Sequence, residues 1–227
     1  MTAILSNLQA VHAAINQAAL LSQRDASQIT LLAVSKTVPA SVIREAYSVG
    51  QHAFGENFVQ EALDKMRELR DLPLQWHFIG PIQSNKTRAM AENFSWVHSV
   101  DRLKIAQRLS EQRPANLPPL NVCVQVNVSG ESSKGGVTTD EAEALAHAIA
   151  VLPRLKLRGL MAIPAPAAGL PEQRAPFAQM RELLKRLNTA GLNLDTLSMG
   201  MSHDLTAAIL EGATIVRVGT AIFGSRK

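Results

Sequence analysis

Short apolar runs alternate along the chain with longer stretches in which apolar residues recur every three or four positions. Unbroken short runs are typical of strands buried on both faces, and the longer periodic stretches are typical of amphipathic helices. Strands are predicted over residues 30–34, 52–54, 76–79, 96–100, 120–128, 156–162, 195–199 and 214–218. Helices are predicted between them, over residues 39–49, 58–70, 84–93, 102–112, 138–152, 172–189 and 202–212, and one more helix, over 3–22, precedes the first strand.

Strands that alternate with helices in this way predict a single α/β domain over residues 1–227, a closed (β/α)8 TIM barrel with an extra N-terminal helix. The last strand is followed by too few residues for a long helix of its own. The helix before the first strand can therefore occupy the empty place in the outer ring. An open, doubly wound sheet is the alternative, and it would leave that first helix without a role.

Charge and composition exclude several classes of protein. The net charge is +4, but the basic residues are mixed with acidic ones, so no nucleic-acid partner is expected and only a mild preference for anionic ligands remains. No apolar run approaches the roughly 20 residues of a membrane span, and the N-terminus has no basic leader, so we expect a cytoplasmic protein that is not bound to a membrane. The single cysteine, Cys123, is expected in the core, and the scattered histidines have no metal-ligand spacing. Without a long exposed apolar stripe, a monomer is expected.

Lys36 follows directly on the apolar run of the first strand and precedes a break at Pro39. In a barrel it would lie at the carboxyl end of the strand, on the face where active sites form. Apolar surroundings disfavour an ammonium, so the neutral amine becomes accessible and could form a Schiff base with an aldehyde. The alternative is a lysine that simply points into water, as most lysines at strand ends do.

Two loops suit an anion. Ser202 follows the seventh strand and is predicted to open a helix, and Gly219 and Thr220 follow the eighth. Barrels often bind phosphate at these two loops, and glycine and hydroxyl groups suit such contacts. Arg217 alternates with two valines in the last strand, so its side chain could reach the same mouth, although it could instead pair with a carboxylate.

A Schiff-base lysine and a phosphate site at one mouth suggest pyridoxal 5′-phosphate (PLP), which is an aldehyde with a phosphate. An arginine facing the pyridine nitrogen would leave that nitrogen unprotonated, because a guanidinium does not give up its proton. The ring would then be a weaker electron sink than in enzymes that protonate it.

The chain resembles a known family, the YggS/PROSC family of PLP homeostasis proteins. The resemblance covers nearly the whole chain in the same order and rests on the segments Ala33-Val34-Ser35-Lys36, Phe54-Gly55-Glu56-Asn57, His77-Phe78-Ile79-Gly80, Gln83-Ser84-Asn85-Lys86, Ser198-Met199-Gly200-Met201-Ser202 with Asp204, and Arg217-Val218-Gly219-Thr220. It implies the barrel of the alanine racemase N-terminal domain as a stand-alone unit, with PLP bound by Lys36, Asn57, Met199, Ser202, Arg217, Gly219 and Thr220.

The resemblance also implies a role for each of these residues. Lys36 would carry PLP as an internal aldimine, and Arg217 would face the pyridine nitrogen. Asn57 would lie near the phenolic oxygen, and Met199 would line the pocket. The phosphate would be held by the residues of the last two loops.

The chain lacks obvious partners for catalysis. Racemases with this barrel use a tyrosine base opposite the lysine, but the only tyrosine, Tyr47, falls in a predicted outer helix. His77 and His98 lie in predicted core strands, where hydrogen-bonded core histidines are commoner than catalysts. A protein that buffers, protects or delivers PLP, with PLP-dependent apo-enzymes as possible recipients, is therefore preferred. Lys134, in the loop after the fifth strand, could accept PLP transiently, or could be an ordinary solvated lysine.

Two other functions stay open. One is a PLP-dependent amino-acid racemase or lyase, which would turn over an amino acid. The other is a Schiff-base aldolase without a cofactor, which would be colourless and would take up no PLP.

Overall fold

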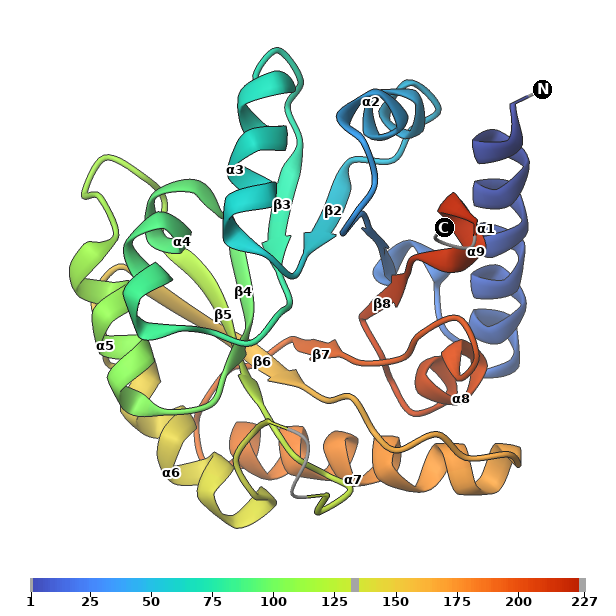
Figure 1. Cartoon of the computed structure of the whole chain (residues 1–227). Helices are drawn as coiled ribbons and strands as arrows, with labels where there is room; N and C mark the ends of the chain where they lie inside the picture. Colours follow the sequence, from blue (N-terminus) through green and yellow to red (C-terminus); the bar gives the residue numbers. More distant parts are fainter. Residues whose placement is uncertain (1, 132–134, 225–227) are drawn as a thin grey trace.

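The computed structural model describes residues 2–131 and 135–224, and its strands form a closed parallel barrel in sequence order (Figure 1). The strands are β1 (Thr30–Val34), β2 (Ala53–Glu56), β3 (Gln75–Phe78), β4 (Trp96–Val100), β5 (Leu120–Gln125), β6 (Leu155–Met161), β7 (Thr196–Ser198) and β8 (Ile215–Val218). β8 pairs with β1, with Thr30 opposite Ile215 and Ala33 opposite Val218, and this pairing closes the ring. The predicted (β/α)8 barrel is thus confirmed, and an open sheet is excluded.

Helices surround the barrel in Figure 1. They are α1 (Ala3–Leu21), α2 (Ala40–Ser48), α3 (Val59–Glu68), α4 (Thr87–Asn93), α5 (Leu103–Gln112), α6 (Thr139–Ala150), α7 (Leu170–Thr189), α8 (Leu205–Leu210) and α9 (Thr220–Phe223), with short 3-10 turns η1 (Ala26–Gln28) and η2 (Ser84–Lys86). The prediction that Ser202 opens a helix is wrong, because α8 begins only at Leu205. The Asp204 side chain accepts a hydrogen bond from the Met201 N–H at 2.5 Å, which holds the intervening residues in a turn.

The first helix takes the place in the ring that the short α9 leaves empty. α1 packs against α8, α9 and α2, and Figure 1 shows it beside α9. Two polar contacts fix it there. Asn7 donates to the Ile222 carbonyl at 2.8 Å, and Arg24 donates to the Ile209 and Ala213 carbonyls at 3.1 and 2.8 Å. The role predicted for this helix is confirmed.

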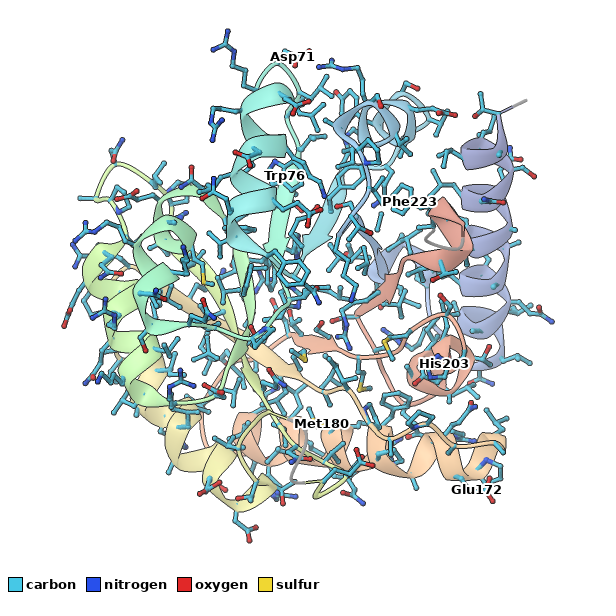
Figure 2. The ribbon with its side chains drawn as sticks, viewed as in Figure 1. Asp71, Trp76, Glu172, Met180, His203 and Phe223 are labelled. Atoms are coloured by element: carbon cyan, nitrogen blue, oxygen red, sulfur yellow. The ribbon has the colours of Figure 1, made fainter. Side chains whose placement is uncertain are left out.

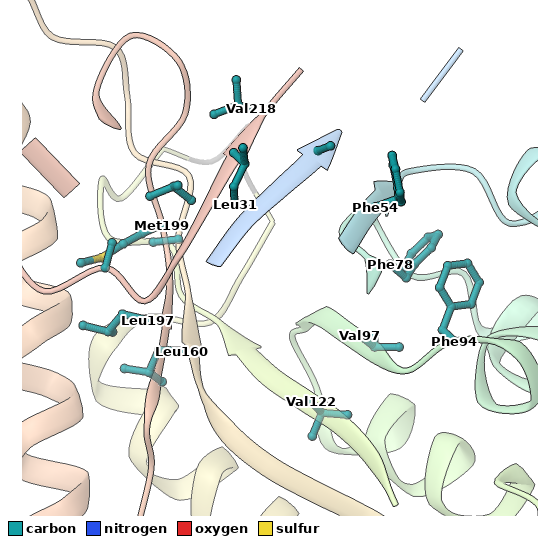
Figure 3. Packing of buried hydrophobic residues seen from close by; sticks show 14 of the residues in the cluster. Leu31, Phe54, Phe78, Phe94, Val97, Val122, Leu160, Leu197, Met199 and Val218 are labelled. Carbon is teal, nitrogen blue, oxygen red and sulfur yellow. The ribbon is translucent and has the colours of Figure 1, made fainter. Parts of the chain in front are cut away.

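Side chains of each strand alternate between two separate apolar regions, as the period of two in a strand requires. The larger region lies between the barrel and its helices, and Figure 3 shows part of it, including Leu31, Phe54, Val122 and Leu197. The smaller region consists of Leu32, Ala53, Trp96, Cys123, Met161 and Ile215, with Ile79 packed against it. Its members occupy the alternate positions of the strands, so their side chains point the other way and fill the barrel interior. We call this odd or even position of a residue along a strand its parity. Residue parity therefore decides which side chains can reach the mouth of the barrel.

Cys123 lies in this interior and is fully buried. Burial raises the pKa of its thiol to about 12, so it behaves as a small core residue, as predicted. Over residues 2–131 and 135–224, no helix has the length and hydropathy of a membrane span, and no three His, Cys, Asp or Glu side chains are grouped as metal ligands would be.

Candidate functional site

A cavity of about 320 Å³ lies at the mouth where the strands end. Its lining residues are Val34, Lys36, Asn57, Ile79, Ile163, Met201, Ser202, His203, Arg217, Gly219 and Thr220. Six of the residues predicted to bind a cofactor are among them, although they come from four separate segments of the chain. The volume is that of a pocket for a small molecule.

Lys36 reaches this cavity because of its parity in the chain. Leu32 belongs to the interior region and Val34 lines the cavity, so Lys36 continues the same inward-facing row beyond the end of β1. The apolar part of the cavity wall includes Val34, at the end of β1, and Ile79, directly after β3. The side chain is half-buried, as a lysine at the rim of a pocket should be.

Arg217 also faces inward, but it is almost completely buried, with 4% of its surface exposed. Its guanidinium donates to the carbonyl and hydroxyl of Ser198 at 2.6 and 2.7 Å and to the Ala162 carbonyl at 2.8 Å. These bonds use three of the five N–H donors of a guanidinium and fix its plane at the cavity wall. Burial lowers the pKa of Arg217 to about 10, so the group remains a cation at neutral pH.

A chain of hydrogen bonds runs from Arg217 into the barrel. The Ser198 hydroxyl contacts His98 Nδ1 at 2.8 Å, and His98 Nε2 contacts His77 Nδ1 at 2.9 Å. Because a guanidinium only donates, these contacts are consistent with Ser198 donating to His98 and His98 donating to His77; His77 Nε2 is buried and has no partner among the described residues. Desolvation lowers the pKa of His77 to about 3 and, with the nearby His77 and Arg217, lowers that of His98 well below its usual range. Both imidazoles are therefore neutral, which confirms them as hydrogen-bonded core residues.

The two loops that were predicted to take an anion meet at one side of the cavity. Gly200 has a φ of +94°, and a Cβ on it would lie 2.5 Å from the Ala208 Cβ, so only glycine allows this turn to pack on α8. The turn presents Ser202, and the other loop presents Gly219 and Thr220. Ser202 and Thr220 are exposed hydroxyl donors.

Charge at the lining is one-sided. Lys36 and Arg217 contribute cations, and none of the lining residues carries a carboxylate. An anionic group would thus meet attraction from both cations; the nearest negative charge that acts on Arg217 is Asp204, which is not a lining residue. The predicted alternative, in which Arg217 pairs with a carboxylate, is wrong, because its partners are the carbonyl and hydroxyl oxygens described above.

Asn57 is held at the rim by a close approach of two backbones. A Cβ on Gly80 would lie 2.3 Å from the Asn57 carbonyl oxygen, so the space between them admits only glycine. The Asn57 Oδ1 is buried and has no hydrogen-bond partner among the residues that the structure describes. Such an atom stabilises a pocket only when a ligand or water supplies the missing donor.

Met199 is the exception among the predicted site residues, and the expectation that it lines the cavity is wrong. It is fully buried in the larger apolar region outside the barrel, where Figure 3 shows it near Leu197. The reason is its parity, because Ser198 faces inward and both of its neighbours must face the helices. Met201, beyond the turn at Gly200, lines the cavity instead.

Sequence reasoning also missed His203, which lines the cavity beside Ser202; Figure 2 labels it near α8. Its Nε2 lies 3.5 Å from Asp204 Oδ2, and half of its side chain is exposed. It was missed because a helix was predicted to start at Ser202, and a residue inside a helix was not expected to line the cavity. Tyr47 lies in α2, stacks edge-on against His52 and is not a lining residue, as predicted. Lys134 lies outside the described residues.

Known proteins resemble this chain over its whole length. Residues 6–227 match the family model described as "Alanine racemase, N-terminal domain". The pyridoxal phosphate homeostasis protein of Pseudomonas aeruginosa is 64% identical over 226 residues, which cover 100% of this chain and 97% of that protein. The protein of the same name from Escherichia coli K12 is 54% identical over 229 residues, covering 100% of this chain and 98% of that protein.

One solved structure adds a cofactor to the comparison. PipY of Synechococcus elongatus, described as a COG0325 family member with PLP bound, superposes with a TM-score of 0.85 at 40% identity and covers 97% of this chain and 100% of that one. With the barrel and the cavity, these similarities show that the chain belongs to the family of pyridoxal phosphate homeostasis proteins and carries the alanine racemase N-terminal domain fold.

Proposed function

We propose that this protein binds PLP at the barrel mouth, held covalently by Lys36, and serves in PLP homeostasis by buffering, protecting or delivering it. The observation that carries the proposal is the meeting of Lys36, Arg217 and the hydroxyl-bearing loops in one cavity without a carboxylate. The unpartnered Asn57 Oδ1 supports it, because a buried acceptor of this kind suits a ligand with a donor.

PLP supplies an aldehyde that condenses reversibly with an amine, so that a C=N bond forms at Lys36 Nζ and the aldehyde oxygen leaves as water. The chain's own residues orient the ligand. Ser202, Gly219 and Thr220 would hold the phosphate, and Asn57 would lie beside the phenolic oxygen. Arg217 would donate an N–H to the pyridine nitrogen, since its pKa of about 10 keeps the guanidinium protonated at neutral pH.

A carrier role follows from what these residues do not provide. An arginine opposite the ring nitrogen would make the ring a weak electron sink, and Tyr47 is not among the residues that line the cavity. Another amine can displace Lys36 from the aldehyde, so a PLP-dependent apo-enzyme could receive PLP by exchange. We further propose that the protein acts as a cytoplasmic monomer.

The test is the visible spectrum of the protein after incubation with PLP, with Lys36→Ala as the variant and Lys156→Ala as the control. Lys156 is an exposed lysine on β6, far from the cavity lining. We expect the PLP absorption band and a borohydride-stable adduct at residue 36 in the wild type and the control, and neither in Lys36→Ala. An adduct that maps to another lysine, or a wild type that takes up no PLP, as a cofactor-free aldolase would behave, contradicts the proposal.

His203 favours a second candidate, a PLP-dependent racemase or lyase, because its imidazole lines the cavity and could accept a proton. Steady turnover of an amino acid by the PLP-loaded protein, abolished in His203→Gln with PLP binding retained, would favour this enzyme. Absence of turnover in both proteins is the result that the carrier role predicts.

A further inference from the structure

The backbone on both sides of Lys36 is held by charged side chains that do not line the cavity. Lys65 Nζ donates to the Ser35 carbonyl at 2.7 Å, and the Ser35 hydroxyl donates to Glu56 Oε1 at 2.6 Å. On the other side of Lys36, the Thr37 N–H donates to Glu61 Oε1 at 2.5 Å. The residues before and after the lysine are thus each fixed by a charged group.

The three charged residues also hold one another. Lys65 Nζ lies 2.8 Å from Glu56 Oε1 and is also bonded to Glu61 Oε1, one helical turn earlier on α3. Glu56 ends β2, where its parity turns it away from the cavity and toward α3. We call Glu56, Glu61 and Lys65 the lysine clamp, because together they connect α3 and β2 to the end of β1.

The backbone that the clamp holds is strained. Thr37 has a φ of +63°, a left-handed conformation that β-branched residues rarely adopt. Such a conformation costs on the order of 1–3 kcal/mol and persists only where the surroundings impose it. Thr37 is itself exposed, so packing of its side chain does not impose it. Two contacts of the backbone hold it: the Val38 N–H donates to the Ser35 carbonyl at 2.9 Å and closes the turn, and the Thr37 N–H donates to Glu61.

Burial shows that the clamp is a costly arrangement. Glu56 is fully buried and Lys65 is 6% exposed. Burial raises the pKa of Glu56, against the opposing effects of Lys65 and Ser35. A buried ion pair is often no more stabilising than apolar residues of the same size. Stability alone is therefore a poor reason for this set of residues, whereas placing charged hydrogen bonds on both neighbours of Lys36 is a specific geometric result.

We propose that Glu56, Glu61 and Lys65 are positioning residues for Lys36, which fix the strained turn after it and so aim its amine into the cavity before PLP arrives. The inference rests on the proposed function, because it concerns the bond between Lys36 and PLP. A lysine side chain loses much rotational freedom when it is fixed, and a backbone that already directs it reduces the entropy that the reaction must overcome. The clamp's hydrogen bonds run to Ser35 and Thr37 and not to the phosphate loops or Arg217, so we expect its main effect on the covalent step.

The experiment compares two ligands that share a phosphate but differ at the reacting carbon. PLP carries the aldehyde, whereas pyridoxine 5′-phosphate carries an alcohol there and cannot react with Lys36. Glu61→Ala removes the acceptor for Thr37 and leaves the Lys65–Glu56 pair in place, so no buried ammonium is left alone. We expect PLP affinity to fall about tenfold, the size expected for one charge-assisted hydrogen bond. Affinity for pyridoxine 5′-phosphate should stay the same.

Two matched variants distinguish positioning from a merely structural role. Glu61→Gln keeps an oxygen acceptor for the Thr37 N–H and should restore PLP affinity to within about twofold of the wild type. Asp64→Ala removes a half-exposed carboxylate of the same helix, which pairs with Arg67, and should change neither affinity. Thermal unfolding of each variant, without ligand, gives the stability effect separately.

Three outcomes would overturn the inference. They are equal losses of affinity for both ligands, no loss for either, or a Gln variant as weak as the Ala variant. All of them presuppose a wild type that forms the adduct at Lys36. If the wild type forms none, the proposed function itself fails, and the two failures are therefore distinguishable.

Discussion

At the scale of single residues, strand parity decides what the mouth of the barrel contains. Ser198 and Arg217 face inward, and this places them in a hydrogen-bonded chain with His98 and His77. His77 also stacks on Trp96, with ring centroids 5.3 Å apart. The chain keeps a buried cation beside neutral imidazoles, so protonation of these imidazoles is opposed by both burial and charge.

This chain predicts a dependence of stability on pH. The pKa of both histidines is lowered in the folded protein, so below the unfolded value of about 6.5 the unfolded chain binds protons that the folded chain does not. The stability is therefore present above pH 6.5 and is lost as the pH falls toward 3, where His77 would titrate. In His77→Gln, the slope of unfolding free energy against pH between 6 and 5 should be lower by up to about 1.4 kcal/mol per unit.

Urea unfolding at each pH measures the slope, and His12→Gln is the control because His12 is exposed on α1. If the slope of His77→Gln equals that of the wild type while that of the control is also unchanged, His77 does not titrate as described.

At the scale of elements, the bounds of strands and helices were predictable wherever the pattern of apolar residues determines them. β1 and β4 have the predicted bounds, because all of their residues except Thr30 are buried. β5 ends at Gln125 rather than at residue 128, since Val126 pairs only in a bridge to Val137. The turn after β7 was not predictable from apolar periodicity, because a side chain hydrogen bond from Met201 to Asp204 decides it.

The same reasoning explains how much of the site could be found. Lys36 and Arg217 follow from strand parity, and glycine and hydroxyl residues indicate the phosphate loops. Met199 was wrongly predicted to line the cavity because its motif was considered without its parity in the strand. His203 was missed because the turn that contains it was predicted as a helix. The lysine clamp was also missed, since Glu61 and Lys65 look like an ordinary surface pair of a charged helix until the fold brings Thr37 to them.

Arg24, just after α1, is predicted to contribute measurably to stability. Its guanidinium donates to the carbonyls of Ile209, in α8, and Ala213, three residues after α8 ends, and the group is partly buried. Arg24→Ala should lower the free energy of unfolding by about 1–3 kcal/mol, because hydrogen bonds from a charged donor are lost.

Arg88→Ala is the comparison, because Arg88 is exposed on α4 and its ion pair with Glu92 spans 3.8 Å. It should change stability by no more than about 0.5 kcal/mol. Similar effects of the two substitutions, measured by urea unfolding, would show that the bonds from Arg24 to Ile209 and Ala213 contribute nothing specific.

At the scale of the whole molecule, the ring of strands and the ring of helices are closed at the same place but by different means. β8 joins β1 through backbone pairing, whereas α1 joins α8 and α9 through side-chain contacts. The cavity lies above this seam, since Lys36 follows β1 and Arg217, Gly219 and Thr220 belong to or follow β8. Two ends of the chain therefore build one side of the pocket.

Because the first helix is tied to the last one through Asn7 and Ile222, the point at which the polypeptide starts is arbitrary for the architecture. A circular permutant, with the old ends joined by a short glycine–serine tether and new ends cut in the loop at residues 114–118, between α5 and β5 and away from the cavity lining, should still fold and still colour with PLP. Loss of PLP absorption in a folded permutant would mean that PLP binding needs α1 and α9 to be unconnected.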